Sequence, residues 1–186
     1  EGTARHVQFL SELLGDILPV RVRSYAAAAN MVTHRIIPLM GMEAFFLAMY
    51  DAPKELHALM AYLRDNALSI MRWYEAEDLL VLNNGNQDSF GSSYNFTDEL
   101  PAPGFDGKHV RLRDMWLSST SQETVGVSPE LFGEFCFPYY RDVCEPMGLL
   151  YWGCCEPAHP IWEYIRRLPH LKKVSISRWC NQNFVG

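Results

Sequence analysis

Short apolar runs bounded by polar or turn residues recur along the chain, and they limit its fold more than any other feature. Each run is four to eight residues long, which is typical of strands in a parallel sheet that is buried on both faces. The predicted strands are Leu18 to Tyr25, Leu79 to Leu82, Leu149 to Trp152 and Val174 to Ser177, with Met115 to Ser119 as a weaker fifth.

Amphipathic segments between these runs predict helices. Asp51 is placed to cap a helix with Pro53 in its first turn, and an apolar stripe at helical spacing continues to Tyr74. A second helix is predicted to begin with Ser128 as its N-cap and Pro129 as its first residue, and to stop at Gly148. Pro138 falls inside that pattern and predicts a break, and a third, short helix is expected from Pro160 to Leu168.

The order of these elements predicts an α/β fold. The last three strand starts lie 25 to 34 residues apart, which is the repeat of a βα unit, and consecutive units build a parallel sheet or a barrel. A complete barrel needs eight units and about 250 residues, whereas this chain of 186 residues supplies about five. We therefore expect a single domain over residues 1–186, either a partial (β/α)8 TIM barrel or a smaller open α/β sheet.

Residues 83–108 are rich in Asn, Gly, Ser and Pro and show no period. We expect a long loop insertion here, directly after a predicted strand, where barrel enzymes place active-site loops.

Composition narrows the class of partner. The formal net charge of −6 and the pI near 5.5 argue against nucleic acid or an anionic membrane as the main partner. No apolar run reaches eighteen residues, and the first residues lack the pattern of a signal peptide. Five cysteines, an odd number, fit reduced thiols better than a disulfide framework. The expectation is a cytoplasmic protein that acts on a small molecule.

Candidate site residues follow four of the five predicted strands, and in α/β folds the carboxyl ends of parallel strands line active sites. They are Asn83, Gln122 and Glu123, the run Cys154-Cys155-Glu156, and Trp179 with Asn181. The two glutamates are candidates for general acid or base, with solvated or ion-paired carboxylates as the alternative.

Cys154 and Cys155 give the sharpest signal. Neighbouring residues on a regular strand point to opposite faces, but a bulge at Gly153 would let both thiols approach one site. Together with Cys180 or His159 they could bind zinc or another thiophilic metal. The alternative is a buried core cysteine beside an incidental neighbour, with His159 on the surface at a helix start.

Two segments resemble a known family. They are Gly126-Val127-Ser128-Pro129-Glu130-Leu131-Phe132 running into Pro138-Tyr139-Tyr140, and Tyr151-Trp152-Gly153-Cys154-Cys155-Glu156-Pro157 continuing to the run from Leu171 to Asn181. From about Leu112 to Asn181 the chain resembles uncharacterised members of the uroporphyrinogen decarboxylase-like superfamily. That superfamily uses a TIM barrel and includes the decarboxylase and corrinoid-linked, zinc-dependent methyltransferases that act on coenzyme M and related thiols. The resemblance implies that this chain spans about half of a barrel.

The resemblance also implies roles for individual residues. The methyltransferases hold zinc with a His-x-Cys motif and a distant second Cys; Cys155 takes the place of the motif cysteine, but Gly153 stands where the histidine should be. Cys154, Glu156 or His159 would have to substitute, and the distant cysteine would fall beyond Gly186.

Three functions follow as expectations. The first is methyl transfer between a corrinoid or other donor and a thiol at a zinc–thiolate site, with a corrinoid protein as partner. In that reading Glu123 and Glu156 are catalytic, and Asn83, Gln122, Trp179 and Asn181 contact substrate. The second is a decarboxylase, whose only cationic candidates here are Arg21, Arg23 and Arg35. The third is a non-catalytic binding module. A half barrel would expose apolar sheet edges, so we expect either a homodimer or dependence on residues of the missing barrel half.

Overall fold

The computed structural model describes residues 2–22, 32–88 and 94–185 and shows a mixed α/β fold. The helices in the amino-terminal part are α1 (Gly2–Leu14), α2 (Val32–Met40), α3 (Met42–Asp51) and α4 (Pro53–Ala76). Those in the carboxyl-terminal part are α5 (Pro129–Phe135), α6 (Phe137–Cys144), α7 (Trp162–Ile165) and α8 (Gln182–Val185), with short 3₁₀ turns η2 (Leu112–Asp114), η3 (Gln122–Thr124) and η4 (His159–Ile161).

A three-stranded parallel sheet forms the centre of the fold. It contains β3 (Trp116–Ser119), β4 (Leu149–Trp152) and β5 (Leu171–Val174), hydrogen-bonded in that order. In the register Leu117 lies beside Leu150, and Ser119 beside Trp152. Because paired residues of parallel strands share a face, these four side chains all point the same way.

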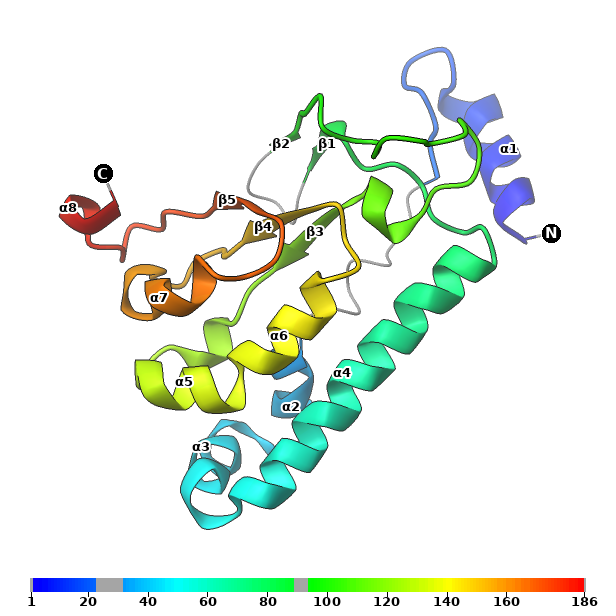
Figure 1. Ribbon diagram of the computed structural model, residues 1–186. Helices are drawn as coiled ribbons and strands as arrows, with labels where there is room; N and C mark the ends of the chain where they lie inside the picture. Colours follow the sequence, from blue (N-terminus) through cyan, green and yellow to red (C-terminus); the bar gives the residue numbers. More distant parts are fainter. Residues whose placement is uncertain (1, 23–31, 89–93, 186) are drawn as a thin grey trace.

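That face is covered by helices. The side chains of Leu117, Leu150 and Trp152 are buried in the main core together with residues of α4, α5, α6 and α7. In Figure 1, α4, α5 and α6 lie on one side of the sheet. Tyr164 of α7 packs so closely on α5 that a Cβ at Gly133 would lie 2.2 Å from its ring. The connections from β3 to β4 and from β4 to β5 therefore place their helices in one continuous layer.

The opposite face is covered by the segment that precedes β3. Its buried cluster consists of Leu100, Trp116, Leu149 and Tyr151. The ammonium group of Lys173 lies 4.6 Å from the centre of the Trp116 ring and 4.9 Å from that of Tyr151, and it donates to the Tyr94 carbonyl at 2.8 Å. Partial burial lowers the pKa of the Lys173 ammonium group. An aromatic–cation cluster thus fixes the long insertion to the sheet.

The expected loop insertion carries structure of its own. Within it, β1 (Gly85–Asp88) and β2 (Tyr94–Asn95) pair in antiparallel fashion, and they lie on the side of the sheet away from α5 and α6 (Figure 1). Asp114, whose side chain is fully buried, accepts hydrogen bonds from the backbone of Ala102 and Arg111 and from the Arg111 side chain. These contacts hold the end of the insertion against η2.

Two of the predicted strands form, a third is displaced and two do not form among the described residues. Met115 to Ser119 and Leu149 to Trp152 are β3 and β4, while the last strand begins at Leu171 rather than Val174. The prediction missed this start because Lys172 and Lys173 interrupt the apolar run. Residues 18–22 form no strand, and residues 23–25 lie outside the described part of the chain.

Leu79 to Leu82 is also not a strand, and Asn83 gives the reason. Its side chain accepts a hydrogen bond from the Trp116 amide at 2.9 Å and donates to the Trp116 carbonyl at 2.8 Å. At the start of β3, the Asn83 carboxamide therefore makes the two hydrogen bonds that the backbone of a neighbouring strand would otherwise make. The preceding residues lie near the sheet without joining its ladder.

The predicted helix starts at Pro53 and Ser128 are confirmed, but the predicted cap at Asp51 is wrong: Asp51 is the last residue of α3, and Ala52 occupies the N-cap position of α4 without a side-chain hydrogen bond. The second helix ends at Cys144 rather than at Gly148. Pro53 begins α4, and Ser128 caps α5 by accepting a hydrogen bond from the Leu131 amide. The break expected near Pro138 separates α5 from α6, with Pro138 in the first turn of α6. The third helix is shorter than expected, because η4 replaces its first turn.

No single helix in the described ranges is long and apolar enough to cross a membrane; α2 and α3 meet that criterion only as a pair, bent by 101°.

Candidate functional site

Glu156 organises the loop that follows β4. It is 4% exposed and accepts three hydrogen bonds: from the Thr120 hydroxyl at 2.6 Å, the Ser121 amide at 3.1 Å and the Cys154 amide at 3.0 Å. Two donors belong to the residues directly after β3, and one belongs to the loop itself. The carboxylate therefore ties the carboxyl ends of β3 and β4 together, and each of its oxygens accepts from the chain's own donors.

Gly153 gives this loop its sharp turn. Its φ of 93° is a conformation that side-chain-bearing residues rarely adopt, and its amide donates to the Ser119 carbonyl at 2.7 Å. A Cβ at this position would lie 3.3 Å from the Cβ of Ser175. The Ser175 hydroxyl donates to the Cys154 carbonyl at 2.7 Å, and the Cys154 amide donates to Glu156. Hydrogen bonds therefore fix the backbone of Cys154 at both its amide and its carbonyl.

The turn brings the two neighbouring thiols to the same side. The sulfur atoms of Cys154 and Cys155 lie 3.5 Å apart, with Cys155 exposed and Cys154 partly exposed. Adjacent residues of a regular strand would diverge, so the expected irregularity at Gly153 does allow both sulfurs to approach one site. The loop presents a vicinal dithiol at the carboxyl end of the central strand.

The other predicted ligands are engaged elsewhere. The Nδ1 atom of His159 accepts a hydrogen bond from the Asn181 amide at 3.2 Å, and the Cys180 sulfur accepts from the Ala158 amide at 3.3 Å. Cys180 is buried. These two contacts join the start of η4 to the segment after β5, so both groups serve to hold that segment in place.

Glu123 lies in η3, after β3, and reaches across to α2. Its Oε1 lies 2.7 Å from Nδ1 of His34, and its Oε2 accepts from the Thr33 hydroxyl at 3.1 Å. The Glu123 side chain is 11% exposed, whereas the His34 side chain is 67% exposed. The pair therefore consists of a nearly buried carboxylate and an imidazole ring that faces solvent.

Tyr140 of α6 connects Glu123 to the loop that Glu156 organises. Its hydroxyl lies 2.5 Å from the Thr33 hydroxyl and 2.8 Å from the Thr120 carbonyl, and the Thr120 hydroxyl donates to Glu156. Burial raises the pKa of the Tyr140 phenol well above its usual value. The phenol therefore stays protonated. Its one proton can be donated to the Thr33 hydroxyl or to the Thr120 carbonyl, but not to both at once.

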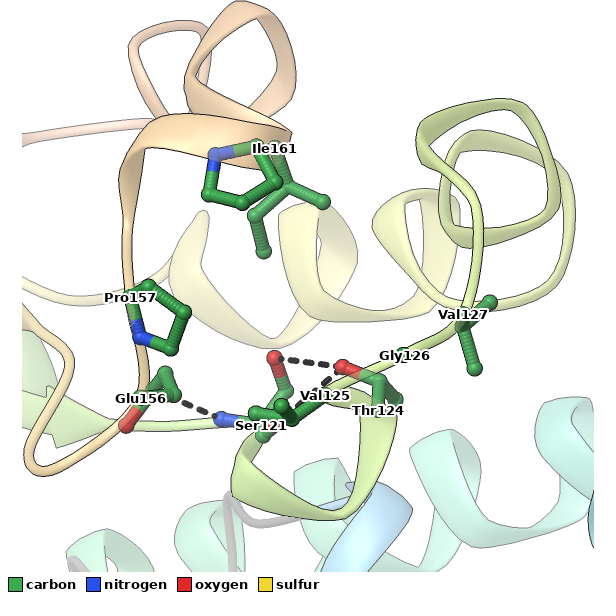
Figure 2. Close-up of a pocket in the computed structure, with 9 residues that line it drawn as sticks. Ser121, Thr124, Val125, Gly126, Val127, Glu156, Pro157 and Ile161 are labelled. Atoms are coloured by element: carbon green, nitrogen blue, oxygen red, sulfur yellow. Dashed lines mark hydrogen bonds between the residues drawn. The ribbon is translucent and has the colours of Figure 1, made fainter. Parts of the chain in front are cut away.

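A small pocket opens beside this network. It has a volume of about 40 Å³ and is lined by Ser121, Thr124, Val125, Gly126, Val127, Glu156, Pro157, Pro160 and Ile161. Figure 2 shows Glu156 directed at the Ser121 amide and the Thr124 hydroxyl bonded to Ser121. The volume suits a few water molecules at most, so the pocket by itself holds no organic substrate.

The remaining predicted substrate contacts are scattered. Gln122 is exposed in η3, while Asn83 is committed to the Trp116 backbone. Trp179 is 61% exposed beneath the Arg178 guanidinium group, and the Asn181 side chain accepts from the Asn183 amide. Gln122 alone adjoins Glu123; the structure does not bring the four residues into one pocket.

Thr33, His34 and Tyr140 are the site residues that the sequence-based prediction missed. Thr33 and His34 lie about 90 positions before Glu123 along the chain, in a segment with no recognised motif. Their proximity to Glu123 depends on the packing of α2 against η3 and α4, for which the sequence carries no direct signal.

The residues present do not fit a closed zinc site. Within residues 2–22, 32–88 and 94–185 no three His, Cys, Asp or Glu side chains are grouped as metal ligands. Cys154 and Cys155 would offer two sulfur ligands, whereas a structural or catalytic zinc requires at least three from the protein.

No family model, curated protein or solved structure matches the chain.

Proposed function

We propose that the chain is part of a (β/α)-barrel enzyme of the uroporphyrinogen decarboxylase-like superfamily. The order β3-β4-β5 with all connecting helices on one face supports this proposal, because barrels are wound in one direction whereas doubly wound sheets carry helices on both faces. The resemblance of residues 112–181 to that superfamily supports it independently.

The proposed reaction is the transfer of a methyl group between a corrinoid or other donor and a thiol. The observation that carries it is the vicinal dithiol of Cys154 and Cys155, exposed at the carboxyl end of the central strand. Glu156 and Ser175 hold the backbone of this loop, so the sulfurs are presented at a fixed place. Exposed thiols held in place at the carboxyl edge of a parallel sheet, where α/β enzymes bind their substrates, are suited to a reaction that involves a thiol.

Zinc belongs to this proposal only through Cys154 and Cys155. When bound by thiolates, zinc makes a thiol nucleophilic at neutral pH. The described residues supply no third ligand, so no step of the proposed reaction is routed through the metal. His159 could join the set only by giving up its hydrogen bond to the Asn181 amide.

The experiment follows methyl transfer from methylcobalamin to a small thiol by the absorbance of the corrinoid. We expect turnover by the wild-type chain and a loss of at least about tenfold in Cys155→Ser. Cys144→Ala is the matched control, because this thiol is buried in α6 and away from the loop.

Zinc content is measured on the same samples. Metal that is lost in Cys155→Ser and kept in Cys144→Ala would place zinc at the dithiol. Turnover that survives in Cys155→Ser would contradict the role of this thiol. Carbon dioxide release from a porphyrinogen, with no methyl transfer, would favour the decarboxylase instead.

A further inference from the structure

Glu123 and His34 differ from an ordinary surface ion pair. The chain also contains such a pair, Asp106 with His109, in which Nδ1 likewise lies 2.7 Å from a carboxylate oxygen. There the carboxylate is 53% exposed, and the pair lies three residues apart in one loop. Glu123 is 11% exposed and joins elements 89 residues apart. Its geometry is set by the fold rather than by a local turn.

The second oxygen of Glu123 is also held. It accepts from the Thr33 hydroxyl, which lies 2.5 Å from the Tyr140 hydroxyl in the buried core. With both oxygens bonded, the carboxylate cannot rotate away from the imidazole ring. A carboxylate fixed at Nδ1 selects the tautomer with its proton on Nδ1, and this leaves Nε2 as a basic lone pair.

We propose that His34 is a general base at the carboxyl edge of the sheet and that Glu123 is its positioning residue. This inference deepens the proposed function, on which it rests for its substrate class, a small thiol. The Nε2 atom takes the proton of the thiol, so that the S–H bond breaks, an Nε2–H bond forms and the electron pair stays on sulfur. Glu123 stabilises the resulting imidazolium ion. The thiolate sulfur then attacks the methyl carbon of the donor: an S–C bond forms, the bond between that carbon and the donor breaks, and its electron pair leaves with the donor.

The first experiment needs no methyl transfer. Nitrogen-15 NMR of the histidine rings at a pH where they are neutral reports which nitrogen carries the proton. We expect His34 to be protonated on Nδ1 in the wild type and to shift toward Nε2 in Glu123→Ala. A wild-type His34 that carries its proton on Nε2 would overturn the proposal.

The second experiment measures the reactivity of Nε2 with p-nitrophenyl acetate. It uses a Cys154→Ser, Cys155→Ser background so that the thiols do not contribute. Nε2 attacks the ester carbonyl, p-nitrophenolate leaves, and water hydrolyses the acetyl-imidazole. We expect His34→Gln to lower this rate about tenfold and Glu123→Gln to lower it several-fold, with His109→Gln as the unchanged control. Equal losses in His34→Gln and His109→Gln, or no loss in either, would overturn the proposal.

The third experiment separates this inference from the proposed function. In the methylcobalamin assay, His34→Ala should fall by about 100-fold and recover in part with added imidazole, which a merely structural role would not produce. Full activity in His34→Ala would overturn the catalytic role. A wild type that reacts with the ester through His34 but transfers no methyl group would refute the proposed function and leave the acid–base pair standing.

Discussion

The loops that follow β3 and β4 each carry one glutamate, and the surroundings of the two carboxylates differ. Glu156 is enclosed by donors from its own loop and from the end of β3. Glu123 instead leaves its loop and bonds to α2, where its partner ring faces solvent. A carboxylate that accepts three hydrogen bonds from the ends of two strands stabilises the fold, whereas one that orients an exposed imidazole ring is available for chemistry. The difference could not be inferred from residue type.

The largest effect is expected for Glu156→Ala. Two backbone amides and one hydroxyl would lose their acceptor in a buried place, which costs about 3 kcal/mol of unfolding free energy. Chemical denaturation measures this loss. Glu163→Ala, at an exposed carboxylate paired with Arg166, is the control and should stay within about 0.5 kcal/mol of the wild type. Equal effects of the two substitutions would refute the structural role of Glu156.

Tyr140→Phe is expected to cost about 2 kcal/mol, because the buried Thr33 hydroxyl and Thr120 carbonyl both lose a partner. Thermal or chemical unfolding gives the value, with the exposed Tyr62→Phe as control. The same variant tests whether the two loops are coupled, since it removes the hydroxyl that connects Thr33, the partner of Glu123, to Thr120, the partner of Glu156. A change in the His34 tautomer in Tyr140→Phe would show that this link fixes Glu123 as well.

Gly153→Ala should cost about 1–2 kcal/mol, from the positive φ and from crowding against Ser175. Gly107→Ala is the matched control, because its φ of 81° is similar but a Cβ there would meet open space. The difference between the two unfolding free energies therefore isolates the contact with Ser175. If the two costs are equal, that contact does not shape the loop.

The smallest effect is expected at the exposed thiol of Cys155, and the buried thiol of Cys144 is its contrast. Cys155→Ser should change the unfolding free energy by less than about 0.5 kcal/mol, because its side chain is exposed. Cys144→Ser should cost about 2 kcal/mol, because it buries a hydroxyl in the core.

Alkylation of the native protein followed by mass spectrometry checks the contrast between the exposed thiol of Cys155 and the buried thiol of Cys144. Burial raises the pKa of the Cys136 and Cys144 thiols and keeps them protonated and inert near pH 8. Cys155 should be labelled under those conditions. Labelling of Cys144 before Cys155 would contradict the burial pattern.

Much of the later fold could be predicted because its signals are local. Pro129 and Ser128 start α5, Pro138 separates α5 from α6, and the apolar run from Leu149 to Trp152 is β4. Each depends on residues within one turn or one strand. Leu79 to Leu82 failed as a strand because the Asn83 side chain, not a backbone ladder, meets β3.

Local sequence signals are sufficient to predict the strands β3 and β4 and the helices between them. They also place the run from Gly153 to Glu156 at the end of a strand. Capping, proline geometry and apolar spacing act over a few residues, so they can be recognised along the chain. The burial of Glu156, the exposure of Cys155 and the contact between His34 and Glu123 follow from the packing of the fold. Those outcomes depend on which elements pack together, and residues 89 positions apart carry no local signal of their contact.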